Sequence, residues 1–210
     1  MHELTTLRNA IDYADQTYYN QGKSPFTDVQ YDAMKARLKA LAPDDERHAR
    51  KRAPVPITSD HPKFKHTIDI LSLDKAYTTD DMARWTASTL NAGEWVGALK
   101  LDGLTIVLYY EEGVLARAVT AGGDDGIGEI VTANALMFKG IPRQLPEKWT
   151  CIVRVEAVLP HADFKAINED LDEDDQYATP RNAAAGIVNR LDGTNCDLIC
   201  AYGIDVVMAG

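Results

Sequence analysis

The chain has little cysteine, no long apolar run and no excess of basic residues. Its three cysteines, Cys151, Cys196 and Cys200, are odd in number and form no CxxC pair, which disfavours a disulfide framework or a zinc site and is typical of reduced thiols in a cytosol. No run of about 18 apolar residues occurs, which excludes a transmembrane helix. The first residues, MHELTTLRNAIDYADQ, carry acids where a signal peptide has its apolar core. We therefore expect a soluble cytoplasmic protein that does not contact membranes.

The positive charge typical of nucleic-acid-binding proteins is also scarce. The chain has 22 Lys and Arg against 32 Asp and Glu, a net charge of −10. Residues 1–70 are close to neutral, with 11 basic and 10 acidic side chains, so the acidity lies in residues 71–210. Any contact with nucleic acid is then local or supplied by a partner. The simpler alternative is that the acids form a solvated surface.

The first 65 residues predict a helical hairpin module and a connector. Apolar residues recur at helical spacing over residues 4–18 and again over 31–41. Thr27 and Gln30 have the capping-box spacing that opens a second helix, and Pro43 ends it. Residues 44–64 are charged and interrupted by proline, which is typical of a connector.

Residues 66–210 predict an α+β domain with a largely antiparallel sheet. A short helix at 79–90 is expected to bury Met82, Trp85 and Leu90. The expected strands are 95–102, 104–110, 114–120, 151–159 and 198–207. The expected helices are 129–138, 161–171 and 182–191. A hairpin turn through Glu111, Glu112 and Gly113 joins two of the strands.

The first candidate for chemistry is Lys100, in the run Lys100-Leu-Asp102-Gly103 at the end of an expected strand. A lysine there can project its amine into a cleft beside a carboxylate. It acts as a nucleophile only when neutral, which requires a depressed pKa. Taken alone, these four residues fit a surface lysine before a turn better.

Two further motifs carry charge at positions of interest. Arg154 and Glu156 lie two apart in an otherwise apolar strand, which fits a polar cleft lining or a salt-linked solvent face equally well. Arg181 follows Pro180 in the run YATPRNAAAG, where a small-residue helix start and a guanidinium suit an anion. The glycine-rich run at 122–128 matches neither phosphate-loop order, so we interpret it as a flexible turn.

The order of these motifs closely resembles the adenylation domain of NAD-dependent DNA ligases. The resemblance runs through KLDGLTIVLYYEEGVLARAVT, GEIVTAN, the strand with R-x-E, PHADFKAINE, ATPRNAAAG and CAYG. The start, YYNQGKSPFTDVQYDAMKARLKAL, is similar to the family's module for the nicotinamide mononucleotide half of NAD. HTIDILSLDKAY resembles the segment that leads into the adenylation domain. The implied fold is α+β. A helical hairpin module (1–65) is followed by the first part of a nucleotidyltransferase domain (66–210) of the ATP-grasp-like ligase type.

The resemblance assigns roles residue by residue. Lys100 would attack the α-phosphate of NAD to give a lysyl-AMP and release nicotinamide mononucleotide, with Mg²⁺ offsetting the phosphate charge. Asp102 would complete the catalytic motif. The residues that the resemblance places at NAD are Tyr18, Asp28, Tyr31 and Asp32 for the nicotinamide nucleotide, Ser72 and Leu73 at the adenine, Gly103 in the pocket, Glu156 at the ribose, and Arg181 near phosphate or DNA.

Departures from the family pattern leave three interpretations open. Ala98 and Ala121 stand where the family usually has a glutamate and an arginine. The later lysine-bearing motifs, the OB domain and most of the DNA-binding surface are missing from these 210 residues. The chain is expected to be the adenylation subunit of a split ligase, as known in some phages, completed by a second subunit and joining nicked double-stranded DNA. The alternatives are a non-catalytic NAD- or partner-binding derivative, and a piece of a longer ligase. The first alternative predicts covered sheet edges, whereas the split subunit predicts an unfinished edge and an apolar patch.

Overall fold

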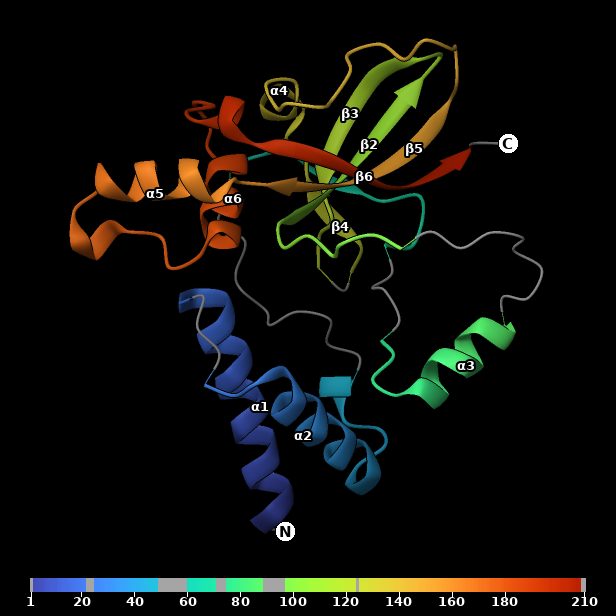
Figure 1. Cartoon of the computed structure of the whole chain (residues 1–210), viewed down its shortest axis with the longest axis vertical. Coiled ribbons are helices and arrows are strands. Elements are labelled where there is room, and N and C mark those ends of the chain that lie inside the picture. Colours follow the sequence, from blue (N-terminus) through green and yellow to red (C-terminus); the bar gives the residue numbers. More distant parts are fainter. Residues whose placement is uncertain are drawn as a thin grey trace.

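The computed structural model describes residues 2–21, 25–48, 60–70, 75–88, 97–123 and 125–208, without the side chains of 2, 16, 18–21, 28 and 174. A pair of helices, α1 and α2, forms the N-terminal part, and a four-stranded sheet with helices α4, α5 and α6 forms the C-terminal part (Figure 1). The α+β class predicted from the sequence is confirmed. In the described part, no helix is long and apolar enough to span a membrane.

The helical hairpin is confirmed, and its capping box forms as predicted. Helix α1 spans His2–Gln21 and α2 spans Asp28–Leu41. Thr27 accepts a hydrogen bond from the backbone of Gln30, whose side chain accepts one from the backbone of Thr27. Ile11 and Leu38 are fully buried between the helices. A 3₁₀ turn, Glu46–His48, follows, and its Arg47 pairs with Asp12 of α1.

The sheet is antiparallel throughout, in the order β3-β2-β5-β6. Its strands are β2 Leu104–Glu111, β3 Val114–Thr120, β5 Cys151–Val158 and β6 Cys200–Met208. Glu112 and Gly113 join β2 to β3 with positive φ angles of 50° and 80°, a turn whose twist matches that of the strands. Four of the five predicted strands are thus confirmed within one or two residues.

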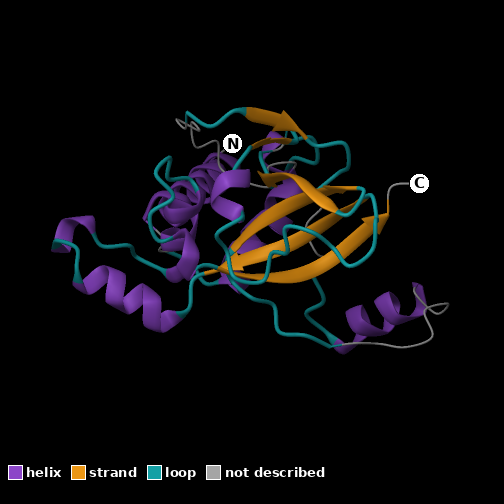
Figure 2. Ribbon diagram, turned by 90° about the horizontal axis from the view of Figure 1, so that it is seen from above, coloured by secondary structure: helices purple, strands orange, loops and turns teal. Residues whose placement is uncertain are grey.

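One face of the sheet carries the main core. Ile106 and Leu108 of β2 and Val155 of β5 point into it and meet the buried small and branched residues of α6. Helix α6 spans Pro180–Val188, α4 spans Thr132–Ala135, and α5 spans His161–Glu169. The 3₁₀ turns Glu173–Asp175 and Cys196–Leu198 complete this layer. Figure 1 shows α4, α5 and α6 beside the sheet, and Figure 2 shows the strands from above with helices next to them.

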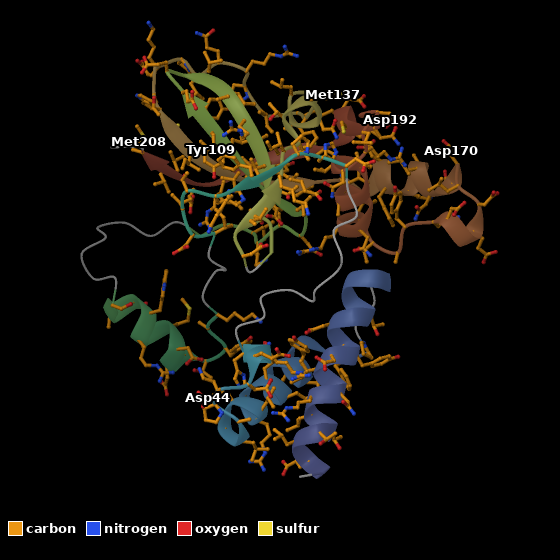
Figure 3. All side chains as sticks on the ribbon, turned by 180° about the vertical axis from the view of Figure 1, so that it is seen from behind. Asp44, Tyr109, Met137, Asp170, Asp192 and Met208 are labelled. Atoms are coloured by element: carbon orange, nitrogen blue, oxygen red, sulfur yellow. The ribbon has the colours of Figure 1, made fainter. Side chains whose placement is uncertain are left out.

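The other face of the sheet is covered over only part of its area. Strand β1, Lys63–Lys65, pairs with β4, Ile127–Glu129, and this two-stranded ribbon brings Phe64 and His66 against Tyr109. Figure 3 shows Tyr109 where the segment around β1 crosses the sheet. This small cluster, with Val107 and Val119, forms a second core.

The three cysteines are free, as the sequence predicted. Cys151 and Cys196 are buried in the main core, and burial raises the pKa of the Cys196 thiol to about 11. A thiol that stays protonated packs as a small apolar group and reacts poorly.

Three sequence predictions are wrong. The strand predicted at 95–102 is absent over 97–102, because both neighbours of β2 in the sheet are already β3 and β5, and residues 95–96 lie outside the described residues. The predicted helix 129–138 shrinks to α4, since β4 takes up its first residue by pairing with β1. Helix α3, Thr79–Ser88, exists and has its Thr78–Asp81 capping bonds, but 49% of Met82 and 41% of Trp85 are exposed. Leu90 lies outside the described residues.

The buried His66 makes the stability of this face depend on pH. Its Nδ1 lies 2.7 Å from the Tyr109 hydroxyl and its Nε2 2.8 Å from the Thr120 carbonyl oxygen. Burial lowers the pKa of His66, and the bond to the Thr120 carbonyl only partly opposes this. Between that lowered value and the unfolded value of about 6.5, the unfolded chain binds more protons, so stability rises with pH there.

We therefore expect the free energy of unfolding to fall as the pH drops below about 6.5, with a contribution from His66 of at most about 1.4 kcal/mol per pH unit. Urea unfolding between pH 5 and 7, as round values spanning that window, measures it. The substitution His66→Gln should flatten the slope, whereas His161→Gln, at an exposed position on α5, should leave it unchanged. An unchanged slope in His66→Gln would contradict the assignment.

Candidate active site

The loop that carries Lys100 is fixed to the sheet through Gly103. Lys100 is exposed in the loop before β2 and makes no hydrogen bond or ion pair within the described ranges. Gly103 is buried, and its backbone N–H donates a 3.0 Å hydrogen bond to the Glu156 carboxylate. A Cβ at this position would lie 2.3 Å from the Ala157 carbonyl oxygen, so only glycine fits. The close approach of the loop to β5 therefore explains the glycine of the Lys100–Gly103 motif.

Glu156 is the anchor of this loop. Its side chain is buried, 9% exposed, and its second carboxylate oxygen accepts a 3.0 Å hydrogen bond from the Thr105 hydroxyl. Thr105 and Glu156 are direct neighbours across β2 and β5. Of the two interpretations of the charged pair on β5, the salt-linked face applies to Arg154, which pairs with Asp205 on β6. Glu156 instead holds the loop.

Arg181 and Asp102 come together from motifs 79 residues apart. Arg181 Nη1 donates a 2.8 Å hydrogen bond to Asp102 Oδ1. Thr179 caps α6 by accepting from the backbone of Asn182, which sets the helix start beside the loop. The Asp102 side chain is 70% exposed and that of Arg181 is 32% exposed. An ion pair this exposed contributes at most about 1 kcal/mol, so Arg181 can exchange Asp102 for another anion at little cost.

The structure adds residues that the sequence interpretation missed. Tyr202 pairs directly with Glu156 across β5 and β6, on the same face of the sheet, and is 50% exposed. Thr105, Glu156 and Tyr202 thus form a row across three strands. The CAYG run was the available sign, because an aromatic residue there continues the alternation of β6 toward this face. Ala121 lies at the end of this row, where its backbone N–H donates to the Thr105 carbonyl.

The nicotinamide residues implied by the resemblance are only partly described. Tyr31 donates a hydrogen bond of 2.5 Å to the buried Asp15. Asp32 accepts hydrogen bonds from Lys75 and Tyr77. Burial opposes ionisation of Asp32, but these bonds outweigh it and hold the pKa of Asp32 below its usual value. The side chains of Tyr18 and Asp28, and all of Ser72 and Leu73, lie outside the described residues.

The arrangement places several charged, polar and aromatic groups at one end of the sheet. They are the amine of Lys100, the paired Asp102 and Arg181, the buried Glu156 and the half-exposed ring of Tyr202. Among the described residues, no three His, Cys, Asp or Glu side chains cluster as a metal cage. A cation here would rely on one carboxylate and on phosphate oxygens from a substrate, as Mg²⁺ commonly does.

We expect Glu156→Ala to lower the free energy of unfolding by about 1–3 kcal/mol, because it leaves the buried Gly103 N–H without an acceptor. Glu156→Gln should cost less, since its amide oxygen can accept from Gly103 while the Thr105 hydroxyl turns to accept from the amide NH₂. Glu111→Ala, at an exposed position on β2, should stay within about 0.5 kcal/mol of the wild type. Urea denaturation of the four proteins tests this, and equal stabilities of the two alanine variants would refute the anchoring role.

Comparison with known proteins identifies the family. Residues 58–199 match the model of the NAD-dependent DNA ligase adenylation domain. The chain is 34% identical over 193 residues to a DNA ligase of Lachnoclostridium phytofermentans, covering 90% of this chain and 29% of that protein. It is 32% identical over 194 residues to a DNA ligase of Leptospira biflexa, covering 90% of this chain and 28% of that protein. It is 34% identical over 200 residues to a DNA ligase of Desulfitobacterium hafniense, covering 90% of this chain and 30% of that protein. The chain spans less than a third of these relatives and belongs to the NAD-dependent DNA ligase family through its adenylation domain.

Proposed function

We propose that this chain carries out the adenylation step of an NAD-dependent DNA ligase. The Nζ lone pair of neutral Lys100 forms a bond to the α-phosphorus of NAD, and the bond from that phosphorus to the bridging oxygen breaks. Nicotinamide mononucleotide leaves with the electron pair, and Nζ releases a proton to solvent. The AMP would then pass to the 5′-phosphate of nicked double-stranded DNA. The observation that carries the proposal is the convergence of the Lys100–Gly103 loop, Glu156 and Arg181 at one end of the sheet in a chain of this family.

The neighbouring residues supply binding and orientation. Glu156 holds the loop through Gly103 and lies in the row that faces the nucleotide, and the Tyr202 ring beside it offers a stacking surface for adenine. Arg181 can exchange Asp102 for a phosphate oxygen. Bound Mg²⁺ would neutralise phosphate charge. Asp102 would be the carboxylate that holds it, because it is exposed and the closest carboxylate in sequence to Lys100.

The helical module is the proposed site for the nicotinamide half of NAD. We propose the same division as from the sequence, residues 1–65 for the module with its connector and 66–210 for the adenylation part. In the module, Tyr18, Asp28, Tyr31 and Asp32 would bind the nicotinamide nucleotide, and Ser72 and Leu73 would flank the adenine. Since both NAD and nicked DNA are its substrates, we place its action in a bacterial or phage-infected cytoplasm.

The nucleophile can be tested by intact-mass measurement after incubation with NAD and Mg²⁺. We expect the wild-type chain to gain the mass of one AMP, either alone or after addition of the remaining part of a relative's ligase. Lys100→Ala should gain none, because it removes the attacking amine. Lys148→Ala, at an exposed lysine of the same domain, should react like the wild type.

A wild-type chain that gains no AMP under either condition would reject the catalytic proposal. NAD binding without an adduct would then favour the non-catalytic derivative, for which Ala121 beside Thr105 is the structural argument. A missing arginine at this position removes a charge-assisted hydrogen bond to phosphate, a loss of about 1.5–3 kcal/mol.

We also propose that the second ligase polypeptide segment docks on β6. Within the part of the chain that the structure describes, β6 is an edge strand whose one sheet neighbour is β5. Its exposed apolar residues lie on both faces, and they are Tyr202, Ile204, Val206, Val207 and Met208, each 41–56% exposed. Figure 3 shows Met208 at the free end of the strand. Asp205 is the one charged residue of β6, and it pairs with Arg154 of β5. Long, mostly apolar edges invite pairing with another strand, and native proteins normally protect them.

The opposite edge of the same sheet, strand β3, is protected by other parts of the chain. The backbone of β3 is bridged at Val114 to Gln144 and at Val119 to Ile130, so other parts of the chain cover it. Among the described residues of β6, only Cys200 forms such a bridge, and its partner is Lys139. Since the relatives continue well beyond the length of this chain, the additional sequence of a ligase is the occupant that fits the open edge.

The docking proposal predicts a difference between two exposed edge valines. Val206 on β6 is 56% exposed and Val114 on β3 is 52% exposed. We expect Val206→Lys to weaken binding of the unmatched remainder of the Lachnoclostridium phytofermentans ligase by tenfold or more, about 1.4 kcal/mol, because it puts a charge on the docking strand. Val114→Lys should have little effect. Biosensor titration measures both, and equal affinities of the two variants would place the partner elsewhere.

A further inference from the structure

The carboxylate of Asp32 joins the helical module to the segment that leads into the adenylation domain. Lys75 Nζ lies 3.1 Å from each of its two oxygens, and the Tyr77 hydroxyl donates to one of them. Both partners lie more than 40 residues further along the chain, beyond the connector. The segment around Lys75 and Tyr77 is therefore brought to the face of α2 on which Asp32 lies.

The groups around Asp32 form a small cluster of lysines and aromatic rings. Lys35 also acts electrostatically on Asp32, and its ammonium lies 5.9 Å from the centroid of the Tyr31 ring. The ammonium of Lys75 lies 6.0 Å from the centroid of the Tyr77 ring. Lys35 and Lys75 balance Asp32 and the buried Asp15, which accepts a hydrogen bond from Tyr31, so the cluster is close to neutral in a chain whose total charge is −10. The cluster therefore pairs two ammonium groups with two aromatic rings.

Lys75 can leave Asp32 and bind another anion, because the ion pair between them is largely exposed. The Lys75 side chain is 63% exposed and that of Asp32 is 27% exposed. Ion pairs at this exposure contribute little, so a competing anion can take the lysine at small cost. Tyr77 is 61% exposed, so its ring has a free surface for a ligand.

We propose that Lys75 and Tyr77 complete the nicotinamide-nucleotide site, with Lys75 binding the 5′-phosphate and Tyr77 contacting the nicotinamide ring. This inference rests on the proposed function of the helical module. A nicotinamide nucleotide joins a cationic ring to a phosphate through one ribose. A phenol face attracts a cationic ring, and an ammonium group binds phosphate as a point charge. Lys75 is held by Asp32 until the phosphate takes its place.

The test compares two ligands that differ only in the phosphate, nicotinamide mononucleotide and nicotinamide riboside. Isothermal titration of the full chain gives the dissociation constant for each. In Lys75→Met we expect the mononucleotide to bind about tenfold more weakly, because a charge-assisted contact is lost. The riboside should bind as it does to the wild type. Tyr77→Ala should weaken both ligands, whereas Tyr77→Phe should keep most of the affinity for each.

Lys39→Met is the matched control, since it removes the same charge from an exposed position on α2. Circular dichroism confirms that each variant is folded. The inference is overturned if Lys75→Met binds the mononucleotide as tightly as the wild type or tighter. Lys75 would then only hold its segment to Asp32 and would not bind the phosphate. Equal weakening of both ligands would also overturn it, because Lys75 would then act only through Asp32. If the wild type binds neither ligand, the proposed donor site fails together with this inference, whereas a failure confined to Lys75→Met leaves the proposed function intact.

Discussion

A buried carboxylate must find donors, and the candidate site depends on how Glu156 meets that requirement. Burial of an unpaired carboxylate is costly, so Glu156 fixes two donors, the backbone of Gly103 and the hydroxyl of Thr105. The first bond draws the lysine loop against β5 until only a glycine fits. The second ties β2 to β5 on the same face. The position of the loop is therefore a consequence of satisfying one charge.

The sheet uses its two faces differently. One face buries branched residues against α4 and α6 and stabilises the fold. The other is closed at one end by the Phe64–His66–Tyr109 cluster and exposes polar and aromatic groups at the other. A face that is only half covered leaves room for a ligand without a separate domain. The open β6 edge borders the same region, so a polypeptide that adds a strand there would lie close to the Tyr202 side of the site.

Local signals were sufficient wherever the partners lie close in sequence. The capping box of α2, the turn at Glu112 and Gly113, and the alternation of β5 follow from residues a few positions apart. Predictions failed where a distant segment decided the outcome. The strand at β4 exists because Lys63–Lys65 pairs with it. Residues 97–102 had a strand-like pattern but no vacant neighbour beside β2, and Met82 and Trp85 of α3 remain half exposed.

The sequence by itself determined the α+β class, the helical hairpin, the antiparallel strands and the family, because periodicity, caps and motif order are properties of the chain. It could not determine which motifs meet. The Asp102–Arg181 pair spans 79 residues, and the Asp32 contacts span more than 40. Only the tertiary structure decided these, along with which sheet edge stays open, because long-range pairing depends on which backbone and charged groups are left unsatisfied once the core has formed.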